Sequence, residues 1–72
     1  MIFKKLKNTQ KIRLLINGVC IYGTVKQIHS MVMNSQVDLL FRDFDRALTD
    51  DPNIKGIGSN YEGLNLQVDF ND

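Results

Sequence analysis

The sequence predicts a small, mostly β domain, and three observations support this prediction. An Asn17-Gly18 pair separates two runs of alternating apolar residues, which is the strongest short-range signal for a hairpin, because both residues tolerate positive φ angles. The run over residues 64–70 also alternates between apolar and polar positions and predicts a final strand. With 72 residues, the chain forms one domain whose core is near the smallest that can outweigh chain entropy.

The predicted hairpin covers residues 11–26 and has a defined register. A two-residue loop places one wholly apolar or glycine row on one face: Ile16 opposite Val19, Leu14 opposite Ile21, and Ile12 opposite Gly23, extended by Val25. The other face holds most of the polar and charged residues of both strands. This alternation is typical of a sheet with one face in solvent.

The charges are unevenly distributed along a chain of net charge +1. Six basic residues and no acidic residue lie between residues 4 and 26, whereas all eight acidic residues lie between 38 and 72. The pattern has two interpretations: solvated faces that keep a small domain dispersed, or a basic surface for phosphates opposite an acidic one. The single Cys20 and the lack of an apolar run of membrane-spanning length predict a cytoplasmic protein that does not enter a membrane.

The segments outside the hairpin are less regular. Apolar residues at helical spacing predict a short amphipathic helix over residues 1–10. Residues 35–53 form a third element and a connection: a helical stripe from Val37 to Leu48, with Ser35 as N-cap, competes with strand-like alternation over residues 37–41. Gly56, Gly58 and Gly63 are expected in turns around Tyr61.

The region around the hairpin resembles the Sm and Sm-like (LSm) proteins, which include the bacterial Hfq type. The first Sm motif contains alternating apolar positions, Asn-Gly, a glycine after four intervening residues, an apolar position and a closing Met-Asn. Here these are Ile12, Leu14 and Ile16, then Asn17-Gly18, Gly23, Val25 and Met33-Asn34. The second motif, an apolar residue followed by Arg-Gly, is similar to Ile54-Lys55-Gly56.

This resemblance implies a strongly bent, five-stranded Sm-like (SH3-like) barrel. The short N-terminal helix would precede it, and a helical turn could lie in the 43–50 connection. Gly23 would permit the bend of the second strand, as a strand-interior glycine does. The single domain would then comprise the helix (1–10), the hairpin and first-motif turn (11–34), the third element (35–53), and the second-motif turn with the closing strand (54–72).

The resemblance also implies a non-enzymatic protein that binds single-stranded RNA, or single-stranded DNA, as a homo-oligomeric ring of five to seven subunits. Asn34 would read a base edge, and Lys55 beside Gly56 would contact the nucleotide. His29, with Met31 or Val32, would stack on a base. A closed ring would also cover the 64–70 strand, which otherwise would be an exposed edge.

A second class of function is a ββαβ interaction module that docks on a larger enzyme through a sheet edge or the 37–48 helix face. It requires a helix over residues 35–50, which separates it from the ring-forming class. No cofactor is expected, and the sequence contains no metal-ligand or nucleophile spacing, because His29 has no second histidine or cysteine ligand near it.

Overall fold

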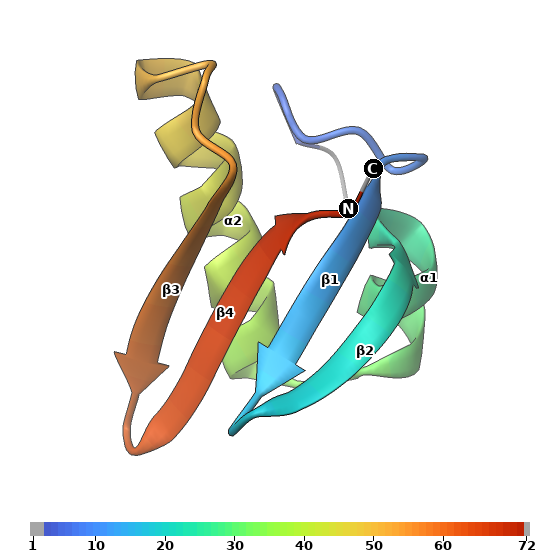
Figure 1. Cartoon of the computed structure of the whole chain (residues 1–72), viewed down its shortest axis with the longest axis vertical. Coiled ribbons are helices and arrows are strands. Elements are labelled where there is room, and N and C mark those ends of the chain that lie inside the picture. Colours follow the sequence, from blue (N-terminus) through green and yellow to red (C-terminus); the bar gives the residue numbers. More distant parts are fainter. Residues whose placement is uncertain (1–2, 72) are drawn as a thin grey trace.

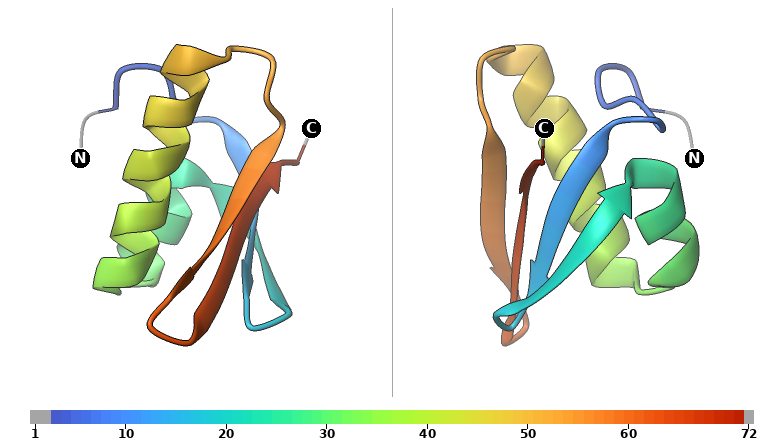
Figure 2. Two further views of the ribbon diagram at one scale, coloured as in Figure 1. Left: turned by 90° about the vertical axis from the view of Figure 1, so that its left-hand side faces the viewer. Right: turned by 45° about the vertical axis from the view of Figure 1, so that its right-hand side comes forward.

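The computed structural model describes residues 3–71 and shows a four-stranded antiparallel sheet with two helices. In chain order the elements are β1 (Lys11–Ile16), β2 (Val19–Thr24), α1 (Val25–Met31), α2 (Ser35–Asp50), β3 (Gly56–Tyr61) and β4 (Leu64–Phe70). The strand order is β2-β1-β4-β3, so the first and last strands lie side by side at the centre (Figure 1). Both helices lie on the same face of the sheet (Figure 2).

The predicted hairpin is confirmed in both its turn and its register. Asn17 and Gly18 have φ angles of 48° and 85°, as a type I′ turn requires. The paired positions are those expected from the two-residue loop, from Ile16 opposite Val19 to Ile12 opposite Gly23. The Asn17 side chain also accepts the N–H of Asn65 at 2.9 Å, which links this turn to β4.

The second strand ends earlier than predicted, because Thr24 begins a helix. Thr24 Oγ1 accepts the N–H of Gln27 while Gln27 Oε1 accepts the N–H of Thr24, which is a capping box. Val25 and Ile28 are then buried as the inner side of α1. A Cβ on Gly23 would lie 3.3 Å from Gln27 Oε1 and 3.4 Å from Ile28 Cγ1, so this glycine allows α1 to pack on β2.

The third element is the helix α2, and the strand-like alternative is wrong. Its apolar side chains recur at three- and four-residue spacing and form one buried stripe: Val37, Leu40, Phe41, Phe44 and Leu48. The N-cap is Asn34 and not the predicted Ser35. The stripe packs on the inner face of the sheet, beside the buried β-strand residues Ile12, Leu14, Leu66 and Val68.

The five-stranded Sm-like barrel is wrong, because the sheet is open and has four strands. Its two edges, β2 and β3, are separated by β1 and β4 and do not meet. Helices cover the inner face that a barrel would enclose with further strands (Figure 2). The 64–70 strand exists as predicted, but β4 is central and paired on both sides, so it is not an exposed edge that a ring would have to cover.

Two smaller predictions are also corrected. Residues 3–10 form bends and a turn and not the predicted helix, while residues 1 and 2 lie outside the described part. The Asp45 carboxylate of α2 holds this segment by accepting the backbone N–H groups of Lys4, Lys5 and Leu6 at 2.6–3.0 Å. Gly56 and Gly58 lie within β3, and the turn between β3 and β4 is made by Glu62 and Gly63, which have φ angles of 55° and 88°.

Candidate functional site

The connection between the two helices forms a corner that combines an open hollow with exposed apolar side chains. The hollow has a volume of about 620 Å³ and is lined by His29, Ser30, Val32, Met33, Asn34, Ser35 and Asp38. We refer to these residues, with Met31, as the corner. It lies at the end of the molecule that also holds the two hairpin turns (Figure 1).

The apolar part of the corner consists mainly of two exposed methionine side chains. Met33 is 92% exposed and Met31 is 64% exposed. Leu39, on the first turns of α2, is 48% exposed. Side chains of this size are normally buried, so two exposed methionines at one connection are a distinctive feature of this surface.

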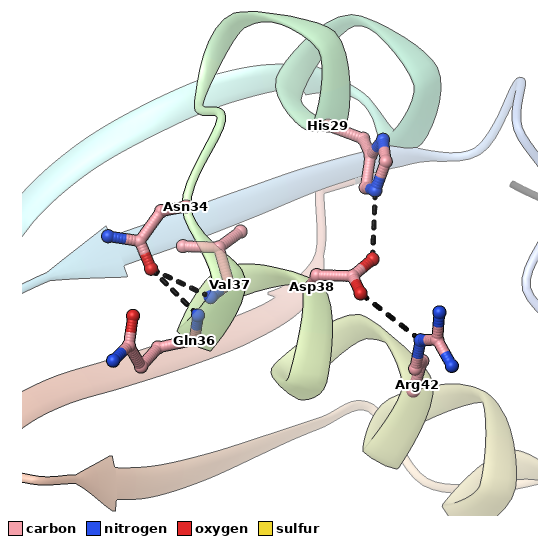
Figure 3. Close-up of polar contacts among 6 residues, drawn as sticks. All are labelled: His29, Asn34, Gln36, Val37, Asp38 and Arg42. Carbon is pink, nitrogen blue, oxygen red and sulfur yellow. Dashed lines mark hydrogen bonds and ion pairs between the residues drawn. The ribbon is translucent and has the colours of Figure 1, made fainter.

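A chain of polar and charged side chains joins the two helices beside this surface (Figure 3). His29 Nε2 donates to Asp38 Oδ1 at 3.0 Å, and Arg42 Nε donates to Asp38 Oδ2 at 3.1 Å. The His29 ring also lies 6.1 Å from the ring of Phe41, centroid to centroid. Asp38 lies in the first turn of α2, where the helix dipole stabilises a negative charge. The contacts therefore fix how α1 and α2 meet and present Arg42 toward solvent.

Asn34 serves the fold at this point. Its side-chain oxygen accepts the N–H groups of Gln36 at 2.8 Å and Val37 at 3.3 Å (Figure 3). These bonds satisfy two of the N–H groups that a helix start leaves free. Asn34, the predicted base reader, therefore has its side-chain oxygen engaged with the backbone.

The structure brings some of the predicted site residues together and separates others. His29, Val32 and Asn34 line the hollow, and Met31 ends the helix beside it. Lys55 and Gly56 lie at the start of β3, at the opposite end of the sheet from the corner (Figure 1). The two predicted motif turns therefore do not form one pocket. The turn between β1 and β2 contains Asn17 and Gly18, and Gly23 lies in β2 where α1 packs against it.

The sequence alone does not single out Met33 and Asp38 of the corner, or Arg42 beside it. Met33 enters there only as part of the family motif, and Asp38 and Arg42 enter only among the charged residues. The spacing of Asp38 and Arg42, four residues apart on a helix, is a readable signal for an ion pair. No sequence signal links Asp38 to His29, because that contact depends on how the two helices meet.

The polar groups of the corner do not form an activated nucleophile. The His29 nitrogen that faces α2 is bound to Asp38, and the Ser35 hydroxyl donates to Gln36 Oε1 at 3.2 Å. In the part of the chain from residue 3 to 71, no three histidine, cysteine or acidic side chains gather in a way that could hold a metal ion. The corner offers contact area and charge for a bound molecule.

The described helices are also too short or too polar to cross a bilayer. Comparison of the chain with models of protein families, with curated proteins and with solved structures gives no match.

Proposed function

We propose that the chain is a small protein-interaction module that binds a segment of a larger partner at the corner. The observation that carries the proposal is the nearly complete exposure of Met33 above the hollow, with Met31 and Leu39 close by in the chain. Methionine is flexible and polarisable, and it is common on surfaces that accept varied apolar side chains. The helical form of residues 35–50 also supports this class of function over a ring of barrels.

The chemistry of the corner favours an amphipathic helical segment with acidic residues beside its apolar stripe. A helix presents apolar side chains at three- and four-residue spacing, which suits an open hollow bordered by Met33. Arg42, whose side chain is exposed, lies next to this hollow, and the exposed Arg46 follows one turn later on α2. These two cations would pair with acidic side chains beside the apolar stripe of the bound segment. Such pairs would fix the orientation of the segment more than they would raise its affinity.

The nucleic-acid function remains a prediction from the resemblance. The corner geometry gives it no support, because Asn34 Oδ1 caps α2 and Lys55 lies at the other end of the sheet. The lone, exposed Cys20 suits the reducing cytoplasm, which we propose as the compartment.

Site-specific photo-crosslinking tests the proposal. A photoreactive phenylalanine replaces Met33 in the full chain, expressed in cells that naturally produce it, and the matched control carries it at exposed Thr49 near the far end of α2. We expect a discrete protein adduct from position 33 and none from position 49. Untagged wild-type protein should compete for the adduct, and the Met31→Gln/Met33→Gln double variant should not.

Three results would contradict the proposed function. The first is the absence of any adduct at position 33. The second is equal adduct formation at positions 33 and 49, which would indicate nonspecific contact. The third is an adduct that disappears after nuclease digestion, because that result would assign the corner to nucleic acid.

A further inference from the structure

We propose that two copies of the chain pair through β3 and form one continuous eight-stranded sheet. This surface is separate from the corner. The starting observation is that β3 is an edge strand, and within residues 3–71 no strand pairs with its outer side (Figure 1). An open edge presents unpaired N–H and C=O groups, and natural proteins usually protect such edges.

β3 has none of the usual protection. Its sequence, Gly-Ile-Gly-Ser-Asn-Tyr, contains no proline and no charge. Its six residues pair with β4 without interruption, from Gly56 opposite Asp69 to Tyr61 opposite Leu64, so no bulge bends the edge away. The edge is therefore regular, and another strand could extend the ladder.

The backbone groups of three residues point outward. In a type I′ hairpin the residues that flank the turn form a hydrogen-bonded pair, and such pairs recur at every second position. Lys55 O accepts the N–H of Phe70 at 2.9 Å, which places the odd-numbered residues on the side of β4. Gly56, Gly58 and Asn60 consequently direct their N–H and C=O groups away from the sheet.

The strand is self-complementary about Gly58. In an antiparallel pair with its two-fold axis at this residue, Gly58 faces Gly58 of the second copy, and the outward-pointing groups of both strands meet. Asn60 would face Gly56, and Ile57 would face Ser59, so that each larger side chain lies opposite a smaller one. Because the contact is isologous, it closes at two copies.

The charges at the two ends of β3 also match in this register. Lys55 of one copy would face Tyr61 of the other and lie next to Glu62. The Tyr61 hydroxyl donates to Asp43 Oδ2 at 2.5 Å, so a second acid is close to the incoming lysine. Lys55 and Glu62 are both exposed in the single chain. The two-fold axis repeats this opposite-charge contact at both ends of the interface.

The pairing should be weak, because one short strand buries less than the roughly 1,200 Å² of a standard interface. We expect a monomer–dimer equilibrium at concentrations on the order of 100 μM, measured by sedimentation equilibrium.

Lys55→Glu and Glu62→Lys should each weaken the dimer about tenfold, since each replaces two attractions by two repulsions. The combined variant should recover dimerisation only in part, because it restores the contact between positions 55 and 62 but leaves Asp43 beside an acidic side chain. Lys26→Glu, which reverses a charge on α1 beside β2, should have no effect.

Hydrogen exchange followed by NMR locates the interface. The amide protons of Gly58 and Asn60 should become more protected as concentration rises, while those of Cys20 and Tyr22 on β2 should not change. Circular dichroism identifies any variant that fails to fold. If Lys55→Glu is unstable, Glu62→Lys still tests the charge contact, because Glu62 lies in a turn. A monomer at 1 mM, protection on β2, or equal loss of dimer with Lys26→Glu would each overturn the proposal.

Discussion

Asn34 shows how a single side chain determines where α2 begins. Replacing it with alanine removes the acceptor for the N–H groups of Gln36 and Val37. We expect Asn34→Ala to lower the free energy of unfolding by about 1 kcal/mol, as measured by urea denaturation. Asn34→Asp keeps the acceptor and should stay within about 0.5 kcal/mol of wild type. Equal losses in both variants would show that the cap is not the source of stability.

The same residue illustrates the limit of reading a sequence one position at a time. Asn34 and Ser35 are both good N-cap residues, and only the backbone places Asn34 outside the first turn. Thr24 and Gln27 carried a stronger signal, the spacing of a capping box. The capping box was not recognised, because Val25 continues the apolar row of the hairpin. A β-branched residue such as valine suits both a strand and a buried helix face.

Among the elements, the attachment of the N-terminal segment to α2 should depend on pH. Partial burial of Asp45 would raise its pKa, but the N–H donors of Leu6, Lys4 and Lys5 outweigh this effect and hold the pKa below its ordinary value. A depressed pKa in the folded state adds stability above the unfolded value near 3.8, and this stability is lost as pH falls through the folded value.

Comparison of wild type with Asp45→Asn tests this attachment. At pH 7 the variant should be less stable by about 1–2 kcal/mol, because a neutral amide oxygen accepts N–H groups more weakly than a carboxylate. The difference should shrink below pH 4 as the wild-type carboxylate becomes protonated. A difference that stays constant from pH 7 to pH 2.5 would contradict the role of the charge.

The elements themselves were predictable to different degrees. The first hairpin follows from Asn17-Gly18 and alternation, because both signals are local. α2 was ambiguous because Val37, Leu39 and Phe41 satisfy a period of two as well as the helical stripe. The exposure of Leu39 shows that the helical period holds. In a strand, Leu39 would lie on the same buried face as Val37 and Phe41. β3 is not predicted, because Gly56 and Gly58 are typical of turns. In the structure Gly56 lies closely against β4, since a Cβ at this position would lie only 2.4 Å from Val68 O.

For the molecule as a whole, stability depends on the aromatic centre of α2 packing against the sheet. Phe44 is fully buried, and its ring lies 5.0 Å from that of Phe70. Phe44→Ala should cost about 3–5 kcal/mol, most of the stability of a domain this small. The matched control is Leu39→Ala on the exposed side of the same helix, which should cost less than about 1 kcal/mol. Thermal unfolding measures both, and similar melting temperatures would contradict this description of the core.

The strand order could not be deduced from the sequence, and this explains why the barrel prediction failed. The resemblance to Sm proteins rests on Asn17-Gly18, Gly23 and Met33-Asn34, which specify a hairpin and the sequence that follows it. They do not specify which strand pairs with β1. That pairing depends on the fit of Leu66 and Val68 beside Leu14, under the Phe41 and Phe44 side chains of α2. Such contacts join residues about 50 positions apart and leave no periodic signal.

The central position of β4 has a consequence for protein synthesis. While the chain is emerging from a ribosome, the hairpin of β1 and β2 can form early, but the inner edge of β1 has no neighbour until Leu64–Phe70 has left the exit tunnel. For that interval the nascent chain exposes an apolar strand edge on which other chains can pair. A ribosomal pause before residue 64 would lengthen this exposure. Chaperone demand should therefore depend on how soon residues 64–70 follow the first hairpin out of the tunnel.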